Sequence, residues 1–178
     1  VLKDLQERFG FSFETGEIPH RNWNAIWEAG FQPIRVHDFC RVRAPFHPPS
    51  DDVRYDLLIQ PRMAFGTGHH DTTWLMMEQM RDLPLSDARV LDYGCGTGIL
   101  AILAAKMGAD AIHAVDIEEE ACKNTRDNAA LNDVHLDRII HGELTGVTGR
   151  NYDLVLANIN RNVILNSLPA LYQKLKRA

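Results

Sequence analysis

Residues 89–99 read RVLDYGCGTGI, and this stretch decides the fold that we expect for the chain. It begins as a short apolar run typical of a buried strand and ends in glycines at positions 94, 96 and 98. Glycine suits a tight turn because it adopts positive φ angles and puts no side chain between the backbone and a ligand. The nearly all-apolar run from Ile99 to Met107, stopped by Gly108, predicts a helix directly after this turn.

Strand and helix patterns alternate along the chain on both sides of the turn. The predicted strands span residues 55–60, 89–92, 111–116, 138–141 and 152–157. The predicted helices span residues 71–83, 99–107, 118–131 and 165–176, the first of them capped by Asp71 or Thr72. Such alternation is typical of βαβ units, so we expect an α/β, Rossmann-like parallel sheet with helices on both faces.

We expect this sheet to be truncated at its carboxyl-terminal end. The last predicted helix would return to another strand, but the sequence ends there, which would leave a strand edge exposed. Residues 51–178 are assigned to this incomplete domain, and residues 1–18 to the tail of a preceding one. Residues 19–50 are interpreted as a proline-rich linker that contains a helical pattern at 22–30 and a strand-like alternation at 39–43.

The composition is ordinary for a globular protein, with 45% apolar residues and a formal net charge of −5. Proteins that bind nucleic acid through its phosphates usually carry a basic stripe, so the negative net charge argues against direct nucleic-acid binding. The same charge is compatible with a basic protein substrate. The sequence has no apolar run of eighteen residues and no signal-peptide pattern, so we expect no membrane association. The three cysteines, Cys40, Cys95 and Cys122, fit neither a disulfide framework nor a CxxC zinc site, which favours the reducing cytoplasm.

Asp116 ends the strand that follows the glycine turn and its helix, eighteen residues after Gly98. In parallel α/β sheets, ligands bind beyond the carboxyl ends of the strands, where Asp116 could accept hydrogen bonds from both hydroxyls of a ribose. The helix that begins at Ile99 would present its free N–H groups to a carboxylate of the same ligand. These features predict a cofactor that carries a ribose and a carboxylate at this edge of the sheet.

The spacing of the glycines separates two classes of cofactor site. The dinucleotide fingerprint is GxGxxG, whereas this chain has GxGxG, preceded by Asp92 and followed by Ile99. This spacing is the one seen in class I methyltransferases, so S-adenosyl-L-methionine is the predicted cofactor. The alternatives are a nicotinamide site and a turn that serves only the packing of helix against strand.

Several other residues are candidates for a role near the turn. Glu143 follows the predicted strand at 138–141, where its carboxylate could accept a hydrogen bond from adenine or simply lie in solvent. Cys95, inside the turn, is interpreted as a small filler because nothing near it in sequence resembles a catalytic base. No metal site is expected, because the adjacent His69 and His70 point differently and have no third ligand nearby.

Three stretches of the chain, at residues 63–73, 90–102 and 154–159, together resemble the motifs of the ribosomal protein L11 methyltransferase family, and the similarity extends over about residues 19–178. Residues 63–73, MAFGTGHHDTT, are similar to the AFGTGxHxTT loop of that family, which is the most specific of the three motifs. Residues 90–102, VLDYGCGTGILAI, are similar to its glycine motif, and residues 154–159, LVLANI, to a strand end with the sequence LVANI.

The resemblance implies S-adenosyl-L-methionine-dependent methylation of amines of ribosomal protein L11, namely lysine side chains and the N-terminal α-amine. It also implies recognition of L11 by an amino-terminal domain, of which residues 1–18 would be the tail. Thr73, Gly94, Asp116 and Asn158 fall where the family binds the cofactor, and Phe65 where an aromatic side chain covers it. Together with the residues argued above, the predicted cofactor-binding set is Phe65, Thr73, Asp92, Gly94, Gly96, Gly98, Asp116, Glu143 and Asn158.

Asn158 is the candidate catalytic residue. Methyl transfer from a sulfonium is an in-line displacement by a neutral amine, so catalysis consists mostly of positioning. We hypothesise that Asn158 accepts a hydrogen bond from the amine and aims its lone pair; the alternative is that Asn158 only positions the cofactor. Nucleobase amino-methyltransferases have two prolines after this asparagine, and Ile159 and Asn160 stand there in this chain, which counts against a base as substrate.

Methylation of L11 is the first of three interpretations that the sequence leaves open. A class I methyltransferase acting on RNA or on a small molecule is the second, because fold alone does not fix the substrate. The third is a catalytically inert cofactor-binding fragment that lacks the recognition domain and the later strands. His69, Asp71 and Asn160 depart from the family's usual residues, and these departures concern the amine entrance rather than a cofactor contact.

Overall fold

The structure is a computed structural model that describes residues 2–10, 12, 32–60 and 71–177. By its contacts the chain divides into two units, Val1–Phe31 and Gln32–Ala178. In the first unit, helix α1 spans Leu2–Phe9. The helix expected at 22–30 and the glycine-rich loop expected at 65–70 lie outside the described residues.

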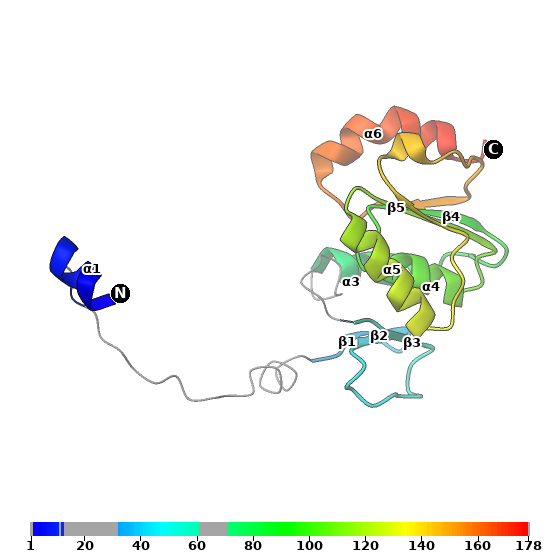
Figure 1. Ribbon diagram of the computed structural model, residues 1–178. Coiled ribbons are helices and arrows are strands. Elements are labelled where there is room, and N and C mark those ends of the chain that lie inside the picture. Colours follow the sequence, from blue (N-terminus) through cyan, green and yellow to red (C-terminus); the bar gives the residue numbers. More distant parts are fainter. Residues whose placement is uncertain (1, 11, 13–31, 61–70, 178) are drawn as a thin grey trace. The chain divides into compact units, whose positions relative to one another are not determined.

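The second unit contains a sheet of four parallel strands in the order β6-β5-β4-β7 (Figure 1). Its strands are β4 (Arg89–Tyr93), β5 (Ala111–Asp116), β6 (Arg138–His141) and β7 (Leu154–Leu156). The parallel sheet predicted from the alternating pattern is therefore confirmed.

Helices cover both faces of this sheet, as predicted (Figure 1). One face carries α3 (Asp71–Met80), α4 (Ile99–Lys106) and α5 (Glu119–Leu131), and the other carries α6 (Arg161–Lys174) and the short 3₁₀ helix η1 (Leu144–Gly146). Alternate residues of a strand point to opposite faces. Val90 accordingly packs in the cluster that includes α4, whereas Leu91 packs with Leu171 of α6.

A second, smaller sheet has the order β1-β2-β3, with β1 antiparallel to β2 and β2 parallel to β3. Its strands are β1 (Ile34–Val36), β2 (Cys40–Arg43) and β3 (Tyr55–Leu58). The strand expected at 55–60 is thus present but joins this sheet instead of the parallel one. Likewise, the described part of the segment interpreted as a linker, residues 32–50, contributes two strands to the second unit.

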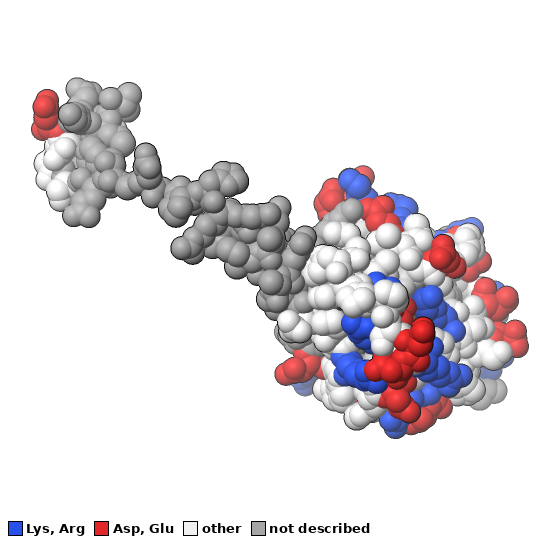
Figure 2. Space-filling view, turned by 90° about the horizontal axis from the view of Figure 1, so that it is seen from below, with Lys and Arg blue, Asp and Glu red and all other residues white. Residues whose placement is uncertain are grey.

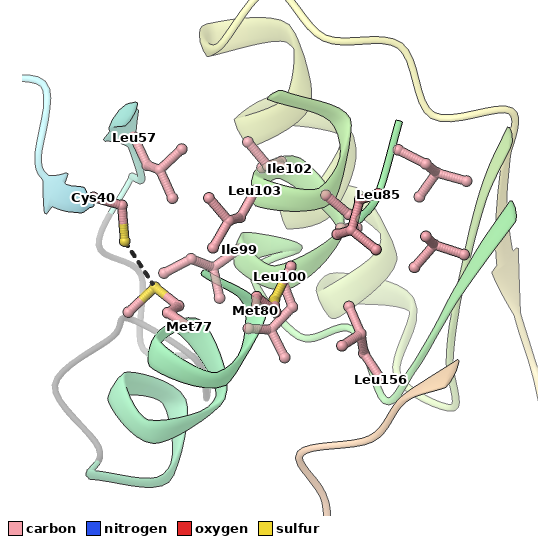
Figure 3. Close-up of a cluster of buried hydrophobic side chains, with 14 of the residues drawn as sticks. Cys40, Leu57, Met77, Met80, Leu85, Ile99, Leu100, Ile102, Leu103 and Leu156 are labelled. Carbon is pink, nitrogen blue, oxygen red and sulfur yellow. Dashed lines mark hydrogen bonds between the residues drawn. The ribbon is translucent and has the colours of Figure 1, made fainter. Parts of the chain in front are cut away.

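Helix α4 is enclosed between the two sheets, which explains its composition. All residues from Ile99 to Ala104 are buried, as expected for a helix that is apolar all round. Leu57 of β3 and Met77 of α3 belong to the same hydrophobic cluster, and Figure 3 shows both around α4. The Cys40 thiol meets Met77 Sδ at 4.0 Å, and burial raises the pKa of Cys40 to about 12.

Helix α6 begins four residues earlier than the apolar pattern indicated, at Arg161 rather than at 165. Asn160 is its N-cap, and its side-chain Oδ1 accepts a 2.8 Å hydrogen bond from the N–H of Asn162. Asparagine is among the favoured N-cap residues because it satisfies one of the otherwise unpaired first N–H groups. Asn160 therefore has a structural role at the start of α6.

Candidate functional site

The carboxyl ends of the four parallel strands bring part of the predicted site set to one edge of the sheet. The register pairs Tyr93 of β4 with Val115 of β5, and Asp116 of β5 with His141 of β6. On the other side of β4, Asp92 pairs with Leu156 of β7. The glycine turn, Asp116 and the segments that carry Glu143 and Asn158 thus all follow strand ends at the edge where α/β sheets bind ligands.

The glycine turn has the tight, left-handed backbone that its sequence predicts. The φ angles are +77° at Gly94, +56° at Gly96 and +77° at Gly98. The N–H groups of Gly94 and Cys95 both donate to the carbonyl of Val115, at 2.8 and 3.1 Å. These bonds hold the turn against the end of β5.

Gly94 and Gly98 also make room for protein side chains. A Cβ atom on Gly94 would lie 2.1 Å from Cγ2 of Ile159, three residues after the end of β7. A Cβ atom on Gly98 would lie 2.8 Å from Cγ2 of Thr125 in α5. We expected these glycines to leave space for a ligand; at these two positions the space is taken by Ile159 and Thr125.

Asp116 is held beside the turn by two backbone hydrogen bonds. Its Oδ2 accepts from the N–H of Gly96 at 2.9 Å, and its Oδ1 accepts from the N–H of Glu118 at 3.0 Å. Each carboxylate oxygen has a second lone pair, and the side chain is only partly buried. Asp116 is therefore oriented by the protein and retains the capacity to accept further hydrogen bonds from a ligand.

Asp92 lies inside the protein, with 1% of its surface exposed. Its Oδ2 accepts a 3.2 Å hydrogen bond from the N–H of Ala101 in the first turn of α4. Burial raises the pKa of Asp92 to about 7, and the nearby charge of Asp116 adds to this while the Ala101 hydrogen bond opposes it. The described contact of Asp92 is thus with α4, and its predicted place in the cofactor-binding set stays a prediction.

Cys95 packs inside the turn as a protonated thiol. The pKa of Cys95 is raised well above its usual range, chiefly by a hydrogen bond with Cys122 of α5 and secondly by burial. Thr125 Oγ1 also contacts Cys95 Sγ, at 3.3 Å. A thiol that stays protonated is a poor nucleophile, which supports the interpretation of Cys95 as a small filler.

Asn158 and Thr73 are in direct contact. Asn158 Nδ2 donates a 2.9 Å hydrogen bond to the hydroxyl oxygen of Thr73, a buried residue of α3 that lies 85 positions earlier in the chain. Because Nδ2 is used in this way, Oδ1 is the end of the amide that can accept a hydrogen bond from a ligand. Within the described ranges no hydrogen bond is donated to that oxygen.

Two further residues of the predicted set are Glu143 and Phe65. The exposed Glu143 follows Gly142, whose N–H donates to the carbonyl of Asp116 at 2.8 Å, so Glu143 sits next to the end of β5. Its contact with adenine stays a prediction. Phe65 lies outside the described residues.

Helix α5 supplies two contacts to the turn that the sequence did not lead us to expect. Thr125 Oγ1 donates to the carbonyl of Gly96 at 3.0 Å, and Asn128 Nδ2 donates to the carbonyl of Thr97 at 2.9 Å. The sequence pattern predicts a helix at 118–131 but assigns it no contact with the turn. The spacing of Asn124, Asn128 and Asn132, four residues apart, is the signal that could have shown a polar row on one face.

The described residues were also compared with the requirements of a pocket elsewhere, a metal site and a membrane span. A cleft of about 440 Å³ lies at the opposite edge of the sheet, where β4 and β7 begin, and is lined in part by Pro84, Asp87 and Asp153. Among the described residues, no group of three or more His, Cys, Asp or Glu side chains is placed to hold a metal ion; His69 and His70 are outside them. In the same part of the chain, no helix has the length and apolar character to cross a membrane.

Comparison with known proteins gives concordant matches. Residues 2–178 match the family model described as ribosomal protein L11 methyltransferase (PrmA). The chain is 50% identical over 159 residues to the ribosomal protein L11 methyltransferase of Porphyromonas gingivalis, an alignment that covers 88% of this chain and 55% of that protein. It is 42% identical over 177 residues to the protein of the same name from Chlorobaculum tepidum, covering 94% of this chain and 61% of that one. The chain therefore spans little more than half the length of these relatives.

Solved structures agree with the fold. The crystal structure of ribosomal protein L11 methylase from Lactobacillus delbrueckii subsp. bulgaricus superimposes with a TM-score of 0.70 at 31% identity, covering 82% of this chain and 75% of that one. An RNA methyltransferase from Salinibacter ruber, in complex with S-adenosyl-L-homocysteine, gives a TM-score of 0.51 at 20% identity, covering 57% of this chain and 67% of that chain. The second likeness shows a shared fold alone.

Proposed function

This chain belongs to the ribosomal protein L11 methyltransferase family, and we propose that the protein it represents is an S-adenosyl-L-methionine-dependent methyltransferase. Its substrates are amines of ribosomal protein L11, namely lysine side chains and the N-terminal α-amine. The L11 methyltransferase names of its relatives support this substrate. Residues 1–18 are then the tail of an L11-recognition domain, 19–50 include the linker, and 51–178 bind the cofactor.

The observation that carries the proposal is the convergence of the glycine turn, Asp116 and Asn158 at one edge of the sheet. The cofactor, when bound, supplies an electrophilic sulfonium methyl group. The residues present fit such a molecule: Asp116 offers an oriented carboxylate for ribose hydroxyls. Gly98 is the N-cap of α4 and has no side chain to cap it, so the positive end of this helix suits the cofactor's carboxylate.

The protein's part in the chemistry is to bind a neutral amine and hold it in line. A lysine of ordinary pKa, about 10.4, is neutral in only roughly one molecule per 10³ at pH 7, whereas an α-amine of pKa about 7.7–8.0 is neutral in about a tenth. Asn158 Oδ1 accepts a hydrogen bond from the amine, which directs the nitrogen lone pair towards the methyl group. The Thr73 hydroxyl supports this arrangement because it engages the other end of the Asn158 amide.

The charge distribution on one face of the molecule gives no support to direct nucleic-acid binding there. On the face shown in Figure 2, the described Lys and Arg side chains lie among Asp and Glu side chains instead of forming a basic stripe. Two ion pairs belong to the smaller sheet and its loops, Arg43 with Asp56 and Arg35 with Asp52. We place the protein in the cytoplasm, together with its ribosomal substrate and without a membrane partner.

The substrate is tested by incubating the full-length protein with methyl-tritiated cofactor and either purified L11 or ribosomal RNA. The expected result is label in L11 that is stable as methylated lysine and methylated α-amine. Label in RNA alone would overturn the proposal in favour of an RNA methyltransferase. Omission of the enzyme and heat-inactivated enzyme serve as controls for non-enzymatic methylation.

A further inference from the structure

Asparagine recurs at positions 124 and 128 of α5 and at its C-cap, 132, a spacing that puts the three side chains on one face of the helix. This face is buried, with 1% of Asn124, 0% of Asn128 and 5% of Asn132 exposed. Asparagine is a poor helix former, and burying its amide is unfavourable unless the polar atoms are hydrogen-bonded. An apolar row would stabilise the packing of α5 more simply, so the asparagines need another explanation.

Asn132 joins α5 to the smaller sheet. Its Oδ1 accepts from the N–H of Leu58 at 2.9 Å, and its Nδ2 donates to the carbonyl of Leu58 at 2.7 Å. The same Nδ2 lies 2.8 Å from the backbone carbonyl of Asn128. Asn132 thus tethers the end of β3 to α5, and these hydrogen bonds involve no atom of the glycine turn.

Asn128 joins three parts of the unit. Its Oδ1 accepts from the N–H of Gln60 at 2.9 Å, just after β3, while its Nδ2 donates to the carbonyl of Thr97 in the glycine turn at 2.9 Å. Nδ2 also lies 3.2 Å from Asn124 Oδ1. The Gln60 N–H at the oxygen end and the two acceptor oxygens at the nitrogen end determine the orientation of this amide.

We propose that Asn128 is a positioning residue for the cofactor, an inference that rests on the proposed function. Its amide holds the Thr97 carbonyl and the Gln60 N–H in one arrangement and so keeps the glycine turn in its binding conformation. Thr97 stands between Gly96, whose N–H orients Asp116, and Gly98, the N-cap of α4. Because glycines restrict the backbone least, hydrogen bonds from neighbouring side chains are needed to hold this turn.

The test is calorimetric titration of S-adenosylhomocysteine into the full chain carrying Asn128→Asp, at a series of pH values. At neutral pH the new carboxylate faces the oxygens of Thr97 and Asn124, and we expect the affinity to fall about tenfold or more. As the pH falls, the protonated carboxyl donates to Thr97 again and the affinity recovers. The carboxyl groups of Asp92 and Asp116 border the turn in both proteins, so each affinity is expressed relative to that of the unaltered chain at the same pH.

Asn132→Asp is the matched control, because it makes the same chemical change one helical turn away. We expect it to lower stability while leaving affinity within about twofold and without recovery at low pH. An affinity for Asn128→Asp equal to that of the unaltered chain, or pH profiles that coincide for the two variants, would overturn the inference.

Two further results are decisive. If Asn128→Asp does not fold, as judged by circular dichroism, Asn128→Ser replaces it, since a hydroxyl is too short to reach both Gln60 and Thr97. We then expect about a tenfold loss of affinity, and unchanged affinity refutes the positioning role. If the unaltered chain itself does not bind S-adenosylhomocysteine, the proposed function fails and this inference fails with it.

Discussion

Asn158 donates a hydrogen bond from its Nδ2 to the hydroxyl of Thr73 over 2.9 Å and thereby links the end of β7 to the first turn of α3. Thr73 is buried, with 1% of its surface exposed, whereas Asn158 is partly exposed. The buried Thr73 hydroxyl therefore orients the Asn158 amide. This contact leaves the Asn158 oxygen as the end that can meet an incoming amine.

Removing the Asn158 amide should impair the chemical step more than cofactor binding. For Asn158→Ala in the full-length protein, we expect kcat for L11 methylation to fall about 10²-fold, in the range seen when a preorganised polar group is removed. The affinity for S-adenosylhomocysteine should change less than about tenfold. Steady-state kinetics at saturating cofactor, together with calorimetry, separates the two effects. An unchanged kcat with a large loss of affinity would assign Asn158 to cofactor positioning only.

Thr73 should act through Asn158. Thr73→Val keeps the shape of the side chain but removes the acceptor of the Asn158 hydrogen bond, so kcat should fall about tenfold. Thr73→Ser retains a hydroxyl and serves as the matched control, with kcat expected within about threefold of the original value. Equal kcat values for the valine and serine variants would show that the hydrogen bond has no part in catalysis.

Asp92 should make stability depend on pH. Burial raises its pKa to about 7 in the folded chain, above the ordinary value of about 3.9 expected when unfolded. The folded state therefore binds the proton more tightly, and this contribution to stability is complete below about pH 4 and lost as the pH rises through 7.

Substitution of Asp92 by Asn should remove that dependence. We expect the free energy of unfolding of the unaltered chain, relative to Asp92→Asn, to fall by up to about 4 kcal/mol between pH 4 and pH 8. Urea unfolding at a series of pH values provides the measurement. A constant difference across this range would mean that the carboxyl of Asp92 is not destabilised by burial.

Gly94 should be intolerant of a side chain for two separable reasons, its positive φ and its proximity to Ile159. Gly108 has φ +96° but its Cβ would meet only Ser86, at 3.6 Å, so Gly108→Ala reports the backbone effect alone. We expect it to cost about 1–2 kcal/mol and Gly94→Ala a further 1–3 kcal/mol from overpacking.

A double-mutant cycle with Ile159→Ala isolates the steric part. The alanine removes the Cγ2 atom that a Cβ on Gly94 would meet, so Gly94→Ala should cost less in that background. Chemical denaturation of the four proteins measures the coupling. Additive effects would show that Ile159 does not restrict this position.

The parallel sheet could be predicted because its signals are local. The runs at 111–116 (AIHAVD) and 138–141 (RIIH) contain apolar and β-branched residues, are followed by polar or glycine residues and form strands with the predicted bounds. The glycine turn is equally local, since positive φ at Gly94, Gly96 and Gly98 follows from residue type.

The second sheet could not be predicted because its cause is tertiary. Strand β1 has only three residues, too few for a periodic pattern. Strand β3 pairs with β2 and not with a strand of the four-stranded sheet. The nearly all-apolar composition of residues 99–107 was the one signal, since a helix exposed on one side would carry a polar face. Only the folded chain shows that the small sheet covers that side.

The sequence allowed the candidate site residues to be named, but not the contacts between them. The position of Asp116 at a strand end followed from the alternating pattern, whereas the roles of Thr73 and Asn158 came from the family resemblance alone. Their contact spans 85 residues, a separation over which spacing in the sequence carries no geometric information. The same holds for Asn128, whose partners lie 31 and 68 positions away.

The central claim is that Asp116 and the glycine turn bind S-adenosyl-L-methionine, and calorimetric titration of S-adenosylhomocysteine tests it most directly. The unaltered chain should bind at one site, and Asp116→Ala should weaken binding about a hundredfold or more by removing a charged acceptor of two ribose hydrogen bonds. Glu120→Ala, which removes an exposed carboxylate from the first turn of α5, should leave the affinity unchanged. Equal affinity for the unaltered chain and Asp116→Ala would contradict the account.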